Sequence, residues 1–221
     1  ETSRQLGKLG FKVLIGSRDE ERGKQAVEIL KKENVDAQLA ILDVSDEKTI
    51  ENLVRFIEEQ YGYLDVLVNN AGVFLEKDIL PSQLSMSILK NTFEINFFGV
   101  FAITKALIPL LKNSSAGRIV NVSSGQGSLT ISSANNASRI QLAYNSSKAA
   151  VNVLTIQFSK ELKETLIKIN SAAPGYTITD MNEGKVNRSV EQSVKIIVQL
   201  ALLDQNGPNG GYFEESVEIP W

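Results

Sequence analysis

The sequence predicts an α/β fold in which helices cover both faces of a doubly wound parallel sheet. Five short apolar segments of strand length recur along the 221 residues, separated by longer segments with helical spacing. The apolar segments are rich in valine, isoleucine and leucine, as expected for strands buried on both faces. No internal repeat, low-complexity tract or linker interrupts the chain. We therefore expect one domain over residues 1–221.

The predicted elements follow one another in a regular order. The strands lie within residues 11–16, 37–44, 64–72, 117–124 and 167–175. The helices run from about Asp19 to Glu33, from Ser45 or Asp46 to Gln60, from Ser82 to Lys112 and from Ile140 to Leu166. Strands that alternate with helices favour right-handed crossovers and parallel pairing. Residues 1–9 are typical of a helix that ends at Gly10.

Composition excludes several classes of function. A net charge of −3 gives no basic surface for nucleic acid, and no apolar run approaches the roughly 18 residues of a membrane span. The first ten residues lack the apolar centre of a signal peptide, and the absence of cysteine fits a cytoplasmic protein. The chain also lacks histidine, which excludes the usual N/S zinc sites and Ser-His-Asp catalysis. Acid–base chemistry must therefore use Asp, Glu, Lys or Tyr.

Small and polar residues end each predicted strand. The five ends are residues 16–18 (GSR), Asp43, residues 69–72 (NNAG), residues 123–125 (SSG) and residues 173–175 (APG). In a parallel sheet these carboxyl ends meet at one edge, where open α/β folds bind ligands. The pattern favours a ligand cleft there, although strand ends are also ordinary turn positions.

Tyr144 and Lys148 lie one helical turn apart in the fourth predicted helix. Tyr144 begins an inward stripe of residues at helical spacing, and Lys148 borders that stripe. A lysine in such a place loses hydration unless a polar group meets it. The pair is either an acid–base device or a core tyrosine beside a lysine whose aliphatic stem lies along the protein surface and whose ammonium group stays in water.

The motifs together resemble those of the short-chain dehydrogenase/reductase family, closest to its carbonyl-reductase branch. The matching segments are YNSSK (144–148), NNAG (69–72), EINFFG (94–99), GRIVNVSS (117–124) and PGYTITDMN (174–182). The ending GGYFEESVEIPW and the wide separation of Ser124 from Tyr144 point to that branch. The resemblance implies a Rossmann-like fold. Residues 130–141, inserted before Tyr144, are either a loop beside the substrate mouth or an insertion without function.

The resemblance also implies catalytic roles. Tyr144 would be the general acid that protonates a carbonyl substrate, and Lys148 would lower the pKa of Tyr144 and bind the nicotinamide ribose. Ser124, with Ser123 as the alternative, would donate to the substrate oxygen. Asn96 would hold a water in the proton path; the alternative is that it caps a helix kink.

Cofactor contacts follow from the same resemblance. Asn69, Ala71 and Gly72 would line the adenosine side, with Asp43 near the adenine. Pro174, Gly175 and Thr179 would frame the nicotinamide. Ser17 and Arg18 stand where the family distinguishes its coenzymes, and a guanidinium suits a 2′-phosphate, so the sequence predicts NADP(H).

The sequence departs from the family at its beginning. The family's first strand and glycine-rich phosphate loop would precede Glu1, so we expect a domain incomplete at its amino terminus. The sheet would then lack a central strand and leave two strand edges unpaired. A chain that begins at Glu1 is expected to bind cofactor weakly.

The leading hypothesis is NADPH-dependent reduction of a ketone or aldehyde. The alternatives are an NAD-linked alcohol dehydrogenase and a non-catalytic binding protein on the same scaffold. A small-molecule carbonyl compound is the expected partner, without nucleic acid or membrane. The extra loop before Tyr144 favours a monomer, with a homo-oligomer as the alternative.

Overall fold

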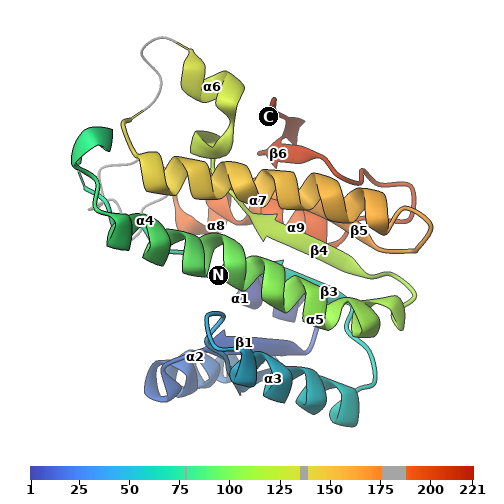
Figure 1. Ribbon diagram of the computed structural model, residues 1–221. Coiled ribbons are helices and arrows are strands. Elements are labelled where there is room, and N and C mark those ends of the chain that lie inside the picture. The colour runs from blue at the N-terminus through green and yellow to red at the C-terminus, as the bar shows by residue number, and fades with distance from the viewer. Residues whose placement is uncertain (78, 135–138, 176–187) are drawn as a thin grey trace.

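The strands form two separate sheets in the computed structural model, which describes residues 1–77, 79–134, 139–175 and 188–221. The first sheet pairs β1 (Val13–Ser17) with β2 (Ala37–Ile41) in parallel. The second has the order β3-β4-β5-β6-β7, with parallel pairing except between β6 and β7. Its strands are β3 (Val66–Asn69), β4 (Arg118–Val122), β5 (Lys168–Ala173), β6 (Tyr212–Glu214) and β7 (Val217–Glu218) (Figure 1).

Helices connect these strands. They are α1 (Thr2–Lys8), α2 (Glu20–Lys32), α3 (Glu47–Gln60), α4 (Met86–Phe93), α5 (Val100–Lys112), α6 (Leu129–Ser133), α7 (Leu142–Glu161), α8 (Val190–Ser193) and α9 (Lys195–Ala201). A π-helical segment, η2 (Glu94–Gly99), joins α4 to α5. Short 3₁₀ turns are η1 (Pro81–Gln83) and η3 (Gly125–Gly127).

The five predicted strands and four predicted helices are confirmed, with three differences in detail. Asp46, not Ser45, caps α3, because the Asp46 carboxylate accepts from the backbone N–H of Lys48 at 3.0 Å. The predicted helix from Ser82 begins only at Met86, where Ser85 is the cap, and η2 interrupts it. The helix predicted over 140–166 is shorter, at Leu142–Glu161.

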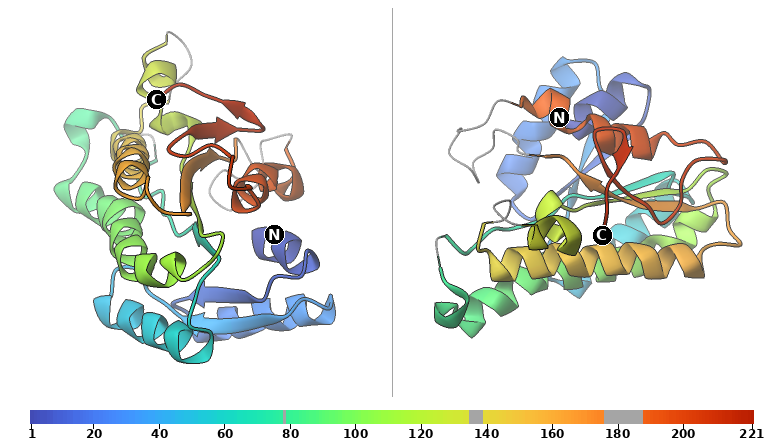
Figure 2. Two further views of the ribbon diagram at one scale, coloured as in Figure 1. Left: turned by 90° about the vertical axis from the view of Figure 1, so that its right-hand side faces the viewer. Right: turned by 90° about the horizontal axis from the view of Figure 1, so that it is seen from above.

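Helices cover both faces of the sheet, as the doubly wound prediction requires. One large cluster of buried side chains joins α3, α5 and α7 to the sheet, with Leu107, Leu111, Ile119 and Val151 nearly inaccessible. A second cluster lies on the opposite face and joins α1 and α9 to Val120 and Ala172. Figure 2 (left) shows α5 and α7 on one side and α1 and α9 on the other. Helix α2 packs on β1 and β2 through a third cluster.

The sheet is divided between β1 and β3. Among the described residues, β1 pairs only with β2, and β3 pairs only with β4. The facing edges of β1 and β3 are therefore unpaired, and the expectation of a divided sheet is confirmed. A cavity of about 1370 Å³ lies between the two edges, with Val13 and Ile15 on one wall and Val66 and Val68 on the other. The same cavity continues to the carboxyl ends of the strands.

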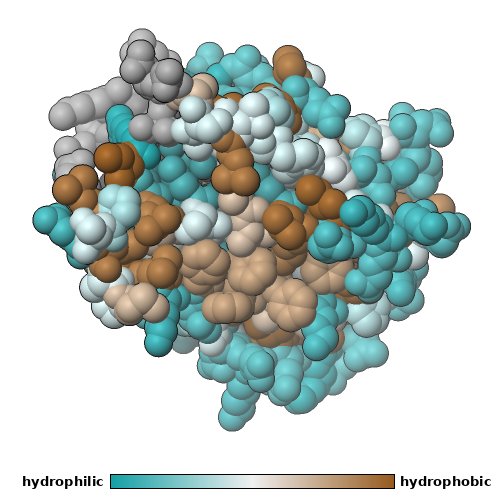
Figure 3. All heavy atoms as spheres, turned by 45° about the horizontal axis from the view of Figure 1, so that its top comes forward, coloured by the Kyte–Doolittle hydropathy of each residue, from teal (hydrophilic) through white to brown (hydrophobic). Residues whose placement is uncertain are grey.

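Part of the surface is apolar. The stretch Met86–Lys112 is long and apolar enough to cross a membrane, but half of its most apolar window is buried in the protein, so it is weak evidence for a membrane span. Exposed side chains from this stretch include Met86, Phe98 and Phe101. Figure 3 shows brown and tan atoms gathered across the middle of one face.

Candidate active site

The ends of β3, β4 and β5 converge on the cavity, as the sequence predicts, and Gly16 near the end of β1 also lines it, but Ser17, Arg18 and Asp43 are not among its lining residues. Residues from the loops after β3, β4 and β5 line its polar end, together with two side chains of α7 and one from β6. They are Asn70, Ala71, Gly72, Ser123, Ser124, Gly125, Tyr144, Lys148, Pro174, Gly175 and Glu214. The structure therefore brings Tyr144, Lys148 and Ser124 to one cavity.

Lys148 is a buried cation. It is 5% exposed, and its Nζ donates to the backbone carbonyl of Val122, at the end of β4, over 2.7 Å. Burial lowers the pKa of Lys148 from 10.5 to about 8, because removing the ammonium from water disfavours its charged form. The Lys148 side chain does not lie along the surface with its ammonium in water. The alternative interpretation of the Tyr144–Lys148 pair, which required this, is therefore wrong for Lys148.

Tyr144 is held on several sides. Its ring meets the ring of Phe74 edge to face, with centroids 5.5 Å apart. Nζ of Lys148 lies 5.8 Å from the centre of the Tyr144 ring. The backbone N–H of Tyr144 donates to the carboxylate of Glu76 over 2.6 Å, and its carbonyl accepts from Ser147 Oγ at 2.7 Å. These contacts fix Tyr144 at the amino-terminal end of α7, on the side that faces the cavity.

The two serines after β4 have different surroundings. Ser123 is 3% exposed, and its hydroxyl donates weakly to the backbone carbonyl of Lys148 at 3.4 Å. Ser124 is partly exposed and begins the η3 turn, where its hydroxyl accepts from the N–H of Gln126 at 3.3 Å. The buried Tyr212 donates its hydroxyl to the carbonyl of Ser124. Of the two serines, Ser124 is thus the one with the more accessible side chain.

Asn96 connects three parts of the site. It lies fully buried in η2, and its Oδ1 accepts from the N–H of Val73 at 2.8 Å. Its Nδ2 donates to the Val73 carbonyl and to Ser147 Oγ, both at 3.0 Å. Asn96 thereby ties the segment after β3 to α7. Both amide hydrogens are used, so the expected role of Asn96 in holding a water stays a prediction.

Two glycines allow close approach of the backbone. A Cβ on Gly72 would lie 3.5 Å from Asn96 Oδ1 and 3.6 Å from Lys148 Nζ, so the loop after β3 passes directly beside these two side chains. A Cβ on Gly127 would lie 2.9 Å from the backbone of Lys148. The η3 turn therefore packs against α7 at the level of the lysine, and this contact requires glycine.

Asn69 belongs to a buried polar network. Its Nδ2 donates to Thr104 Oγ1 at 2.9 Å and to Asn121 Oδ1 at 2.7 Å. The network continues through Asn121 to Thr155 and from there to Ser171, across β3, β4 and β5. The Asn69 amide nitrogen is therefore committed to this network, while Asn69 also lines the cavity.

Arg18 lies at the end of β1, where coenzyme choice is expected. Its side chain is exposed and makes no hydrogen bond or ion pair within the described ranges. Ser17 uses its hydroxyl to donate to the Asp19 carbonyl at 2.7 Å. The Asp43 carboxylate accepts from the N–H and hydroxyl of Ser45, and these bonds, with a smaller effect of Arg18, lower the pKa of Asp43. Asp43 thus also forms the turn after β2.

Pro174 and Gly175 begin the loop after β5. Gly175 has φ of +72°, a left-handed conformation that favours glycine. Arg188 Nη1 donates to the Pro174 carbonyl at 3.0 Å and lies 3.7 Å from Glu214, and its other amino group pairs with Glu215. Thr179, expected near the nicotinamide, lies outside the described residues.

The residues before α7 border the cavity. Ile131, Arg139 and Gln141, from the inserted segment, are among its lining residues. This position agrees with a loop beside the substrate mouth. Across the described ranges, no group of three or more acidic side chains could hold a metal ion.

The sequence did not indicate three residues of the site. Glu76 follows the NNAG motif without periodicity or a motif of its own, and Tyr212 and Glu214 lie on a strand of three residues. The only signal for Tyr212 and Glu214 was their place in the ending GGYFEESVEIPW. Nothing in the sequence pattern pointed to Glu76.

Several known proteins are similar to this chain in sequence and in fold. Residues 1–189 match the family model described as short chain dehydrogenase. The (+)-neomenthol dehydrogenase of Arabidopsis thaliana is 33% identical over 96% of this chain and 90% of that protein. The carbonyl reductase (NADPH) 1 of Mus musculus is 31% identical over 95% of this chain and 88% of that protein. The structure of salutaridine reductase from Papaver somniferum has a TM-score of 0.84 and 28% identity, covering 96% and 94% of the two chains.

Proposed function

Because the chain belongs to the short-chain dehydrogenase/reductase family of oxidoreductases, we propose that it reduces a ketone or aldehyde to an alcohol with NADPH. The observation that carries the proposal is that Tyr144, Lys148 and Ser124 line one cavity, with the Lys148 ammonium 5.8 Å from the centre of the Tyr144 ring. In a chain without histidine, a phenol beside a buried ammonium and a hydroxyl can together supply acid catalysis on a carbonyl oxygen.

Tyr144 is the general acid in this proposal, and its hydroxyl gives a proton to the substrate oxygen. Lys148 acts through its charge, which favours the phenolate that remains and so makes the phenol a better acid. Ser124 donates to the same substrate oxygen and stabilises the negative charge that develops there. Asn96 holds the loop after β3 against α7 through its hydrogen bonds to Val73 and Ser147. A water beside Asn96 would return a proton to Tyr144.

The cavity suits a dinucleotide in several respects. Its polar end lies at the carboxyl ends of the parallel strands, where open α/β folds bind nucleotides. Gly72 brings the loop after β3 within van der Waals distance of the Asn96 and Lys148 side chains. Bound NADPH would supply the hydride; Lys148 would bind its ribose, and the loop at Pro174 and Gly175 would border its nicotinamide.

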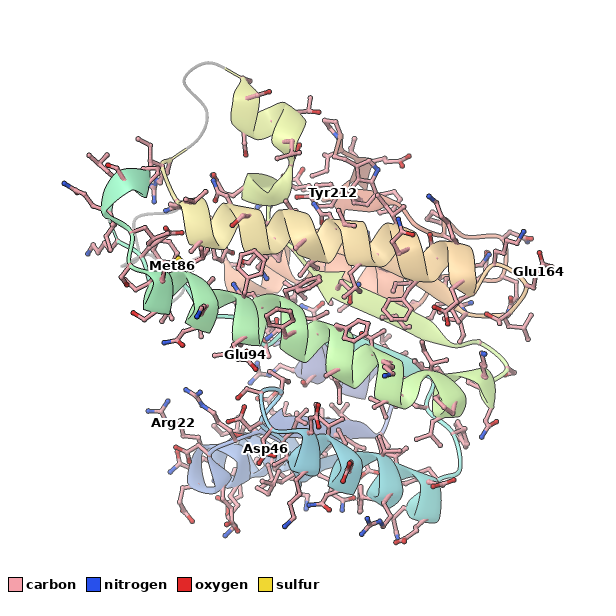
Figure 4. All side chains as sticks on the ribbon, viewed as in Figure 1. Arg22, Asp46, Met86, Glu94, Glu164 and Tyr212 are labelled. Atoms are coloured by element: carbon pink, nitrogen blue, oxygen red, sulfur yellow. The ribbon has the colours of Figure 1, made fainter. Side chains whose placement is uncertain are left out.

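Arg18 supports NADPH over NADH, because an exposed guanidinium that makes no hydrogen bond or ion pair in the described ranges can bind a 2′-phosphate. The test compares kcat/KM for the two coenzymes in the wild type, Arg18→Ala and Arg22→Ala. Arg22 is a matched control: it is exposed on α2 and pairs with Asp19 (Figure 4). We expect Arg18→Ala alone to reduce the preference for NADPH, by about tenfold or more. A wild-type preference for NADH would overturn the coenzyme assignment and favour the NAD-linked alternative.

The catalytic assignment is tested by Tyr144→Phe with a panel of ketones and aldehydes and NADPH absorbance as the readout. The variant keeps the ring contact with Phe74 and loses only the hydroxyl. We expect the fold and the melting temperature to persist while turnover is lost. Unchanged turnover would refute Tyr144 as the acid. Binding of NADPH without any turnover by the wild type would favour the non-catalytic alternative.

A further inference from the structure

Glu76 is a buried carboxylate for which the proposed mechanism has no use. It is 1% exposed and lies in the segment between β3 and η1. One of its oxygens accepts from the backbone N–H of Tyr144 at 2.6 Å. The other, Oε2, is buried and has no hydrogen-bond partner among the residues described. A buried polar atom without a partner is destabilising, so stability alone does not explain this glutamate.

The contact lies at the start of the helix that carries the proposed acid and its lysine. The first N–H groups of a helix have no partner within the helix, and a side chain at the N-cap usually accepts from the third residue. In α7 the N-cap is Gln141, which makes no such bond, and the third residue is Tyr144. Glu76 therefore supplies from another segment the acceptor that the helix itself lacks.

Neighbours of Glu76 along the chain hold the same helix. The backbone of Val73 makes two hydrogen bonds with Asn96, which in turn bonds Ser147 of α7. Phe74 meets the Tyr144 ring. The segment 73–76 thus contacts Tyr144 at its ring and at its backbone, and Asn96 anchors the segment itself.

We propose that Glu76 is a positioning residue that fixes Tyr144 by accepting its backbone N–H from across the site. The inference rests on the proposed function, in which Tyr144 is the acid. Its effect on rate comes from geometry, because a displacement of about 1 Å in a reacting group can reduce the rate about a hundredfold. An accepting oxygen at this place is what the role requires, so glutamine should replace glutamate and methionine should not.

The experiment compares Glu76→Gln and Glu76→Met with the wild type. Methionine is unbranched and fills a similar volume without an acceptor, and it removes the oxygen that has no partner. We expect Glu76→Met to melt within a few degrees of the wild type or above it. Its kcat should fall at least tenfold with KM for NADPH within twofold, while Glu76→Gln keeps kcat within about threefold. Glu94→Gln and Glu94→Met are the matched controls, since Glu94 is an exposed glutamate on η2 (Figure 4), and both should behave as the wild type.

Amide hydrogen exchange at Tyr144 gives a second readout that does not depend on turnover. Exchange should be faster in Glu76→Met and unchanged in Glu76→Gln. A Glu76→Met variant with a lower melting temperature but normal kcat would overturn the proposal, since that is the behaviour of a purely structural residue. Equal loss of kcat in both variants, or unchanged exchange in Glu76→Met, would also overturn it. A wild type that reduces no carbonyl compound refutes the proposed function, whereas the exchange result still decides whether Glu76 holds Tyr144.

Discussion

The lysine beside the proposed acid should set the alkaline limit of activity. Lys148 must be protonated for its charge to assist Tyr144, and burial lowers its pKa to about 8. In the free enzyme, Lys148 would then be about 90% protonated at pH 7 and about 10% at pH 9. We therefore expect kcat/KM for NADPH to fall about tenfold between pH 7 and pH 9 and tenfold per unit above that. A lysine at its ordinary value of 10.5 would lose almost nothing by pH 9.

The assay is the initial rate of NADPH oxidation from pH 6 to pH 10, in the wild type and in Lys148→Arg. Arginine keeps its proton over this range, so the descending limb should move above pH 10, even if altered geometry lowers the plateau. A loss of folding stability caused by the titration of Lys148 cannot produce the fall in kcat/KM at high pH. Below pH 8 both states are protonated and the burial penalty is complete, and between pH 8 and 10.5 the unfolded state binds more protons, so stability rises. A limb at the same pH in Lys148→Arg would refute the assignment to Lys148.

Three further substitutions test other contacts. Lys148→Met removes the cost of burying the ammonium, about 3 kcal/mol from the lowering of its pKa from 10.5 to about 8. The same change leaves the Val122 carbonyl without its hydrogen bond, which costs about 1–3 kcal/mol. Calorimetry at pH 7 should therefore show equal or higher stability than the wild type, with turnover lost. Gly127→Ala would place a Cβ 2.9 Å from the Lys148 backbone. We therefore expect the free energy of unfolding to fall by about 1–3 kcal/mol, with a lower melting temperature. An unchanged melting temperature would show that η3 can shift to accommodate the Cβ at little cost. Tyr212→Phe frees the Ser124 carbonyl and should lower kcat severalfold. Burial raises the pKa of Tyr212 to about 12, so wild-type stability should fall from pH 10 to 12 as only the unfolded state loses its proton, and urea unfolding of Tyr212→Phe should lack that decrease.

Strong local patterns made much of the fold predictable. The apolar runs containing β1 to β5 have the composition of strands in a parallel sheet. Of these strands, β4 and β5 are buried along nearly their whole length, whereas β1, β2 and β3 are partly exposed. The strands β6 and β7 are short, and β7 is exposed, so neither produces such a run. The π-helical segment that holds Asn96 depends on packing between elements, and a helical pattern by itself predicts an ordinary α-helix there.

The site was predictable to the extent that strand ends must share an edge. That rule brings Gly72, Ser124 and Pro174 to one cavity, and the resemblance added the roles of Tyr144 and Lys148. The rule about strand ends does not predict that the Asn69 side chain points into the interior and donates to Thr104. Whether a polar residue at a strand end faces a ligand or the interior depends on partners far along the chain. The same reason hid Glu76, whose partner lies 68 positions away.

The buried polar groups around Tyr144 indicate where this fold gives up stability for function. Lys148 loses hydration and gains one carbonyl partner, and Glu76 keeps one oxygen that has no hydrogen-bond partner among the described residues. By contrast, the polar network through Asn69 and Asn121 is paired on both sides and ties three strands together. In the described part of the chain, the buried side-chain atoms without a hydrogen bond are Glu76 Oε2, Thr92 Oγ1, Asn145 Oδ1 and Asn152 Oδ1, and two of these four, on Glu76 and Asn145, lie at the start of α7. The Glu76 carboxylate supplies the acceptor that Gln141, the N-cap of α7, does not supply, and this agrees with the proposed role of Glu76 in holding Tyr144.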